Sequence, residues 1–240
     1  MVNLRLDKVN RTVYYFYSPA SGCKKHGKEE NSMPAVTSNY DKARDAMSTE
    51  FLRYDQARMI RKFSLDHDED YIYVTFLNLR YRISRSTGRV EYLAGPDAPV
   101  QAGYNEAMTI YDVLCCSREN CRPAHKFVSV SSLSSVMGGS LSEGQGFFQL
   151  DAELFDGRVD ELRRACLKLS GRELSGGDAA SEFELFPSLA VALRFWSSDD
   201  EFPASLQLLA DANILDFMHY ETLMFALSHL LSMIKEEMSA

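Results

Sequence analysis

Three cysteines and one histidine lie within eleven residues in the middle of the chain: Cys115, Cys116, Cys121 and His125. Zinc prefers thiolate and imidazole ligands in a tetrahedral arrangement. The spacing matches no standard zinc knuckle, however, and a second paired half is missing. We therefore expect Cys115 to be a small hydrophobic residue on the buried face of a helix. No metal site is predicted, and these four residues are the metal candidates to be tested.

The C-terminal third carries a second set of chemically capable groups, six carboxylates: Asp199, Asp200, Glu201, Asp211, Asp216 and Glu221. If residues 189–196 and 204–210 pair as a hairpin, the first three lie at its tip. Asp211 and Glu221 then lie at the opposite end, where they could face each other. Carboxylates that converge on a divalent ion activate water. Because capping and ion-pair networks also gather carboxylates, we favour a structural role.

A ligand pocket is the other chemistry that single residues of this region could serve. Trp196 is the only tryptophan, and it either fills the core or forms a pocket wall. His219 precedes the last apolar stretch, where a histidine is more often a satisfied core group than a ligand. The candidate ligand-binding residues are therefore Trp196, Asp211, His219 and Glu221. No catalytic residue and no cofactor can be assigned from the sequence.

Two familiar binding motifs are incomplete. The acidic stretch 66–70 begins like a calcium loop, but Tyr71 stands at the position of the required glycine and Leu77 at that of the distal glutamate. The glycines at 138–146 form neither a dinucleotide-binding nor a P-loop motif. The sequence therefore predicts a solvated turn at 66–70 and a plain loop at 131–146.

Hydrophobic periodicity and turn residues predict the elements that position these groups. We expect a strand at 9–18 and a mobile loop at 19–38. The predicted helices and strands that follow are a helix at 39–63, strands at 71–77, 79–85 and 89–93, a helix at 103–117, a strand at 126–131, a helical region at 147–169 with a break at Gly157, strands at 183–186 and 189–196, a strand or short helix at 204–210, and a helix at 221–237.

Short neighbouring strands between helices, without regular βαβ alternation, indicate an α+β fold. We expect a mainly antiparallel sheet with helices packed on one face and a long C-terminal helix. No linker is long enough to force two domains. The prediction is a single domain over 1–240, in which 1–38 is an N-terminal strand plus mobile loop and 39–240 is the main body.

The segment 189–231 has a characteristic order of features. An apolar strand is followed by an acidic turn, a second apolar strand and a helix, with the landmarks at Phe195–Trp196, Asp199–Asp200, Glu201–Phe202–Pro203, Asp211 and Glu221. This order resembles a bacterial and archaeal family of domains of unknown function, family 3786. Weaker similarity reaches back to KFVSVSSL and VDELRRACLKL. Some relatives carry a Cys-rich, iron–sulfur-like segment that this chain lacks, and it departs from the family pattern at residues 217–220. The resemblance implies no activity.

Composition excludes several classes of partner. Acidic residues outnumber basic ones by 34 to 26, for a net charge of −8, so nucleic acid is not expected as a partner. No secretory signal and no apolar run of about 20 residues is visible, which argues against a membrane partner. Five unevenly spread cysteines fit reduced thiols. We expect a soluble, acidic, cytoplasmic protein.

Three functional hypotheses remain open. The first is a non-catalytic accessory domain that binds a small molecule or a protein partner, because no triad, nucleotide loop or complete metal set can be assembled. The second is a metal-assisted hydrolase that uses Asp211, Glu221 and a histidine such as His219. The third is a homodimer, or another homo-oligomer, whose interface is the Met- and Leu-rich C-terminal helix.

Overall fold

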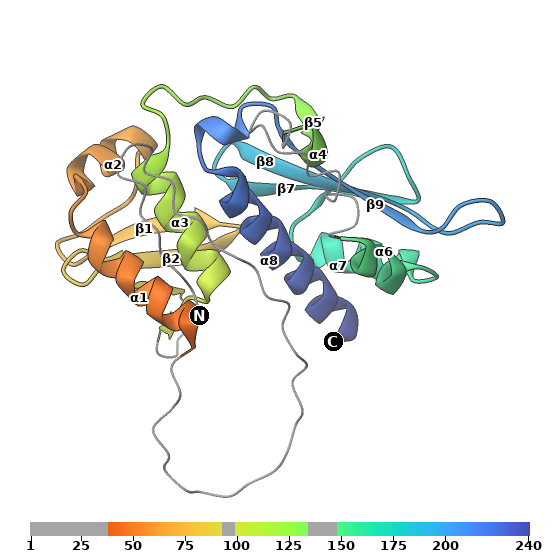
Figure 1. Ribbon diagram of the computed structural model, residues 1–240, viewed down its shortest axis with the longest axis horizontal. Helices are drawn as coiled ribbons and strands as arrows, with labels where there is room; N and C mark the ends of the chain where they lie inside the picture. The colour runs from red at the N-terminus through yellow and green to blue at the C-terminus, as the bar shows by residue number, and fades with distance from the viewer. Residues whose placement is uncertain (1–37, 93–98, 134–147) are drawn as a thin grey trace, which may run out of the picture. The chain divides into compact units, whose positions relative to one another are not determined.

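The computed structural model describes residues 38–92, 99–133 and 148–240 (Figure 1). The expected strand at 9–18, nearly all of the expected loop at 19–38, and most of the Ser/Gly-rich loop at 131–146 lie outside these ranges. Within the described part, residues from Ser38 to Ala240 form one compact unit. The fold is α+β, as the sequence predicts.

Strands of the first half form a four-stranded antiparallel sheet in the order β1-β2-β3-β4. Its members are β1 (Tyr71–Phe76), β2 (Leu79–Ser84), β3 (Val90–Tyr92) and β4 (Val100–Gln101). Alternate side chains of β1 are buried, because successive residues of a strand point to opposite faces. The predicted meander is therefore confirmed, with β4 as an additional short edge strand.

Strands of the second half form a five-stranded sheet in the order β5-β9-β8-β7-β6, with every pair antiparallel. Its members are β5 (Phe127–Ser129), β6 (Arg172–Glu173), β7 (Ala179–Phe186), β8 (Leu189–Trp196) and β9 (Ser205–Asp211). Residues 204–210, left open between strand and helix, are thus largely a strand that pairs with β8 as a hairpin. The acidic residues 199–201 lie at the tip of this hairpin, as expected.

The helices up to residue 133 are α1 (Asn39–Phe51), α2 (Gln56–Phe63), α3 (Tyr104–Cys116) and the short α4 (Val130–Leu133). Those from residue 148 onward are α6 (Gln149–Phe155), α7 (Val159–Lys168), the 3-10 turn η2 (Ile214–Asp216) and α8 (Tyr220–Ser239). The predicted break at Gly157 separates α6 from α7, and Gly157 has a φ of +70° that favours glycine.

The prediction of one helix over 39–63 is wrong, because the chain breaks it at Leu52–Asp55. Asp55 has extended backbone angles, and its side chain accepts a hydrogen bond from the Arg58 N–H at 2.9 Å. Aspartate is a preferred N-cap residue because its carboxylate satisfies an N–H that has no partner inside the helix. The local capping preference therefore overrides the continuous apolar pattern.

Within the unit from Ser38 to Ala240, helix α8 lies between α3 and α7 and packs against both (Figure 1). One broad face of it is buried, including Leu223, Leu227 and Leu230, each at most 1% exposed. None of the exposed large hydrophobic residues in the described ranges lies on α8. The apolar face is thus used within the chain, and an oligomer through this helix stays a prediction.

Candidate functional site

A hollow of about 180 Å³ opens between β9, the end of β5 and the first two turns of α8. Three aromatic residues line it, Phe148, Trp196 and Tyr220. The polar lining residues are Ser129, Ser131, Ser205 and Gln207, and the aliphatic ones are Val130, Leu206, Leu208 and Met224. The hollow therefore combines aromatic and aliphatic side chains with several hydrogen-bonding groups, and much of its surface is polar.

Sheet pairing explains why the hollow forms at this place. Trp196 ends β8 and lies opposite Ser205, the first residue of β9. On its other side β9 pairs with β5 only from Leu209 onward, where Ser129 ends the short strand. Residues 205–208 thus have a strand partner on one side only within the described part of the chain. An edge of this kind offers backbone N–H and C=O groups to whatever lies beside it.

The lining of the hollow carries no charged side chain. Tyr220 is 7% exposed, and burial raises the pKa of its hydroxyl, with the nearby Glu221 carboxylate adding to the rise. Tyr220 therefore stays a neutral hydroxyl at physiological pH. A charged ligand would find no counter-ion among these side chains, so the electrostatics favour a neutral one.

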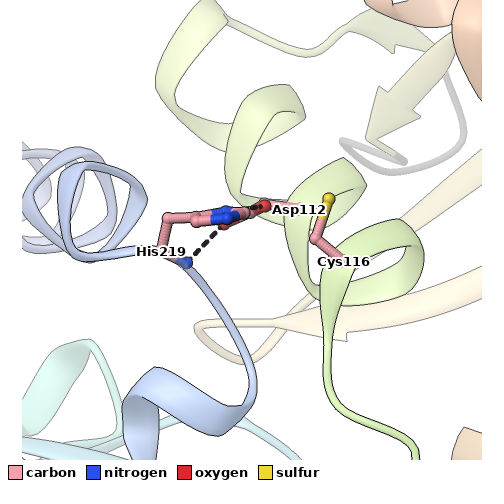
Figure 2. A group of neighbouring side chains, drawn as sticks. All are labelled: Asp112, Cys116 and His219. Atoms are coloured by element: carbon pink, nitrogen blue, oxygen red, sulfur yellow. Dashed lines mark hydrogen bonds and ion pairs between the residues drawn. The ribbon is translucent and has the colours of Figure 1, made fainter. Parts of the chain in front are cut away.

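A second group of side chains with potential ligating atoms lies where α3 meets the start of α8, at Asp112, Cys116 and His219 (Figure 2). Asp112 Oδ2 accepts a hydrogen bond from the His219 backbone N–H at 2.7 Å. Asp112 Oδ1 lies 2.7 Å from the ring nitrogen Nδ1 of the same histidine. This carboxylate therefore holds both the N-cap backbone of α8 and the orientation of the imidazole ring.

Burial and the charge of the partner shift the pKa of each residue of this pair in opposite directions. Burial raises the pKa of Asp112, but the hydrogen bonds and the charge of His219 outweigh it, so the pKa ends below its usual value. The hydrogen bond to Asp112 raises the pKa of His219 against the effect of burial. Asp112 is only 8% exposed, whereas the His219 side chain is 47% exposed. The pair is thus anchored inside the molecule and reachable from solvent.

Cys116 joins this pair because it follows Asp112 by four residues on α3, which places both on one face of the helix. One ligating atom from each of the three side chains lies within 4.8 Å of the others. Cys116 itself is exposed at the last residue of the helix. The sequence suggested Cys116 and His219 in separate groups and missed Asp112, whose only signal was an acidic residue inside an apolar helix.

Asp211 and Glu221 lie in different settings. Asp211 is 3% exposed at the end of β9, and its oxygens accept backbone N–H groups of Ala124, His125 and Asn213 at 2.7–2.9 Å. Those bonds tie the loop before β5 to the end of the sheet. Glu221 lies in the first turn of α8, two residues after His219. The described residues show no converging metal-ligand set that contains Asp211, which leaves the hydrolase hypothesis without one of its ligands.

The other three members of the expected Cys/His cluster do not join Cys116 as metal ligands in the described structure. Burial raises the pKa of the Cys115 thiol well above its ordinary range, so the thiol stays protonated. Cys121 lies in the loop after α3, where burial also raises its pKa although Lys62 opposes the rise. His125 has a φ of +53° and donates its backbone N–H to Asp211.

Comparison with known proteins identifies the chain at the level of a family. Residues 55–233 match the model of a domain of unknown function, DUF3786. The chain belongs to this family. The DUF3786 match spans both β-sheets, the hollow beside Trp196 and the Asp112–Cys116–His219 group. It also extends the resemblance seen at 189–231 across most of the chain.

Neither the curated proteins nor the solved structures contain a match to this DUF3786 chain. Among the described residues, no helix has the length and apolar character required to cross a membrane. Neither comparison adds an activity.

Proposed function

We propose that this chain is a ligand-binding domain whose hollow beside Trp196 holds one small, neutral molecule with a planar ring. The observation that carries the proposal is the hollow of about 180 Å³ with three aromatic side chains and no charged one in its lining.

The size of the hollow limits the ligand to about one ring with small substituents. An engineered protein cavity of about 150 Å³ holds a benzene molecule. The hollow here is slightly larger, and a nucleotide or a peptide would extend beyond it. Offset stacking or edge contacts with Trp196 and Tyr220 would add to the area that a planar ring buries.

The polar groups favour a ligand that both donates and accepts hydrogen bonds. Ser129, Ser205 and Gln207 provide hydroxyl and amide groups, and the edge of β9 adds backbone groups. A carboxamide or a neutral heterocycle can satisfy such groups, because it carries N–H and C=O on one ring system. A carboxylate or an ammonium group would be desolvated without an opposite charge.

The test uses Trp196 as its own reporter, since it is the only tryptophan of the chain. Benzamide, benzoate and benzylamine share a ring and size but differ in charge. We expect benzamide to change the Trp196 emission saturably, with a dissociation constant on the order of 1 mM for so small a ligand. Benzoate and benzylamine should bind at least about tenfold more weakly. Equal binding of all three, or no saturable change, would exclude the proposed site.

Two variants test where benzamide binds. Ser205→Phe adds a ring at the exposed start of β9 and should fill the hollow, which abolishes the benzamide response. Thr75→Phe adds the same ring to an exposed position of β1 in the other sheet and should leave the response unchanged. Circular dichroism of both variants checks that the fold is retained. A response that survives Ser205→Phe would place benzamide elsewhere.

A further inference from the structure

Three side chains of three different ligand types converge where α3 meets α8. Asp112 and Cys116 come from one face of α3, and His219 comes from the N-cap of α8, 107 positions after Asp112. Their ligating atoms all lie within 4.8 Å of one another. Figure 2 shows the Asp112 carboxylate facing the His219 ring, with Cys116 beside it on the same helix.

The types of ligand select among metals. Magnesium and calcium prefer sites made of oxygen atoms, so a thiolate and an imidazole argue against both ions. Zinc binds carboxylate, imidazole and thiolate at about 2.0–2.3 Å. Ionised Asp112 and Cys116 with a neutral His219 would balance the two charges of the ion. Three protein ligands also leave a fourth tetrahedral position for water, as in open zinc sites.

We propose that Asp112, Cys116 and His219 form a zinc site that links α3 to α8. This proposal goes beyond the ligand-binding function proposed above and does not depend on it. The residues involved do not line the hollow, so each proposal can fail alone.

The Asp112–His219 pair would need only a small adjustment to admit the ion. A proton now links Nδ1 of His219 to Oδ1 of Asp112 at 2.7 Å. Two atoms bound to a tetrahedral zinc at about 2.0 Å lie roughly 3.3 Å from each other, so the pair would open by about 0.6 Å as zinc replaces the proton. Asp112 Oδ2 would keep its bond to the His219 backbone N–H. That bond would continue to orient the carboxylate, as outer hydrogen bonds do in metal sites.

The site can be reached from solvent, whereas Asp112, which holds it in place, is buried. Cys116 and the His219 ring reach solvent, so an ion can enter without unfolding of the helices. Asp112 is 8% exposed and is also hydrogen-bonded by the side chain of Thr222 on α8. Preorganised ligands lose little conformational freedom when they bind a metal. The competing explanation is an interhelical ion pair between Asp112 and His219 that needs neither Cys116 nor zinc.

Cobalt(II) distinguishes these explanations. Its thiolate complexes have an absorption band in the near ultraviolet, and tetrahedral Co²⁺ has absorption bands in the visible region. The full chain is purified without an affinity metal, treated with a chelator, and titrated with Co²⁺ under a non-thiol reductant. We expect one Co²⁺ per chain with a thiolate band, and Zn²⁺ should remove the band. A tenfold excess of Mg²⁺ should have no effect. No thiolate band, or a band that Mg²⁺ removes, would overturn the proposal.

Matched cysteine variants locate the ligand. Cys116→Ser changes an exposed residue at the end of α3, so the fold should persist by circular dichroism. It should abolish the thiolate band and weaken Co²⁺ binding at least tenfold. Cys121→Ser, in the nearby loop, should leave both unchanged. A band that survives Cys116→Ser, or disappears in Cys121→Ser, would assign the metal to other residues. His219→Ala should also weaken Co²⁺ binding at least tenfold.

Discussion

At the scale of the residue, the partly buried His229 of α8 shows how tertiary contacts change a side chain's chemistry. His229 stacks on the Phe76 ring, with 5.8 Å between ring centroids, and its Nε2 lies 3.7 Å from Glu106 Oε1. That distance is too long for a hydrogen bond, and Nε2 has no hydrogen-bond partner among the described residues. Burial lowers the pKa of His229, although Glu106 on α3 and Glu236 on α8 oppose the fall.

This lowered pKa predicts a loss of stability in mild acid. Below pH 6.5 the unfolded chain takes up a proton on His229 that the folded chain resists. The free energy of unfolding therefore decreases as the pH is lowered. One proton gives a slope of at most about 1.4 kcal/mol per pH unit. His229→Leu should reduce the difference in stability between pH 7.5 and pH 5.5, measured by urea unfolding. A difference that His229→Leu leaves unchanged would contradict the prediction.

At the scale of the element, the turn between β2 and β3 shows how a single glycine joins a sheet to a helix. Gly88 has a φ of +71°, and a Cβ placed on it would lie 2.0 Å from the Ser48 carbonyl oxygen of α1. Its own carbonyl oxygen accepts a hydrogen bond from the Tyr111 hydroxyl of α3 at 2.7 Å. The sequence placed a turn here correctly, but the contact with two helices required the structure.

Gly88→Ala is therefore expected to destabilise the fold by about 2–4 kcal/mol, from backbone strain and the clash with α1 together. Gly157→Ala is the matched control, because Gly157 has nearly the same φ, +70°, and nothing within 4 Å of the added methyl. That substitution should cost only about 1–2 kcal/mol. Chemical denaturation measures both, and equal losses would show that the contact with Ser48 contributes nothing.

At the scale of the whole molecule, the two sheets meet through β1 and β7. Phe76 is fully buried, and its ring lies 5.1 Å from that of Phe186 between centroids. The Leu77 N–H donates to the Leu185 carbonyl oxygen at 3.1 Å. Helix α8 also packs against α3 on one side and α7 on the other. We infer from this shared core that both sheets unfold together.

Phe76→Ala tests this cooperativity with a reporter in the other sheet. The substitution should lower the free energy of unfolding by about 3–5 kcal/mol, the usual cost of removing a buried phenylalanine side chain. Trp196 fluorescence reports on the five-stranded sheet. The unfolding transition that it follows should move to a lower denaturant concentration by the same amount as the transition followed by circular dichroism. Thr75→Ala, on the exposed face of β1, should change stability by less than about 0.5 kcal/mol. An unshifted Trp196 transition would mean that the sheets unfold separately.

Local patterns in the sequence determined most of the elements. The turn at Gly88, the break at Gly157 and the apolar alternation of the strands depend on residues close together in the chain, so their physical causes are visible there. The helix break at Leu52–Asp55 was missed because the apolar spacing continues across it. The α+β class followed from the order of the elements alone.

Only the tertiary structure decided which side chains meet. Asp112 and His219 are 107 residues apart, and their contact depends on how α3 packs against α8. The hollow beside Trp196 exists because β5 stops opposite Leu209 while β9 begins four residues earlier. Contacts of this kind depend on strand register and helix packing, which are set by the whole core. Local sequence patterns therefore identified Trp196 and His219 as candidates, but not the residues that surround them.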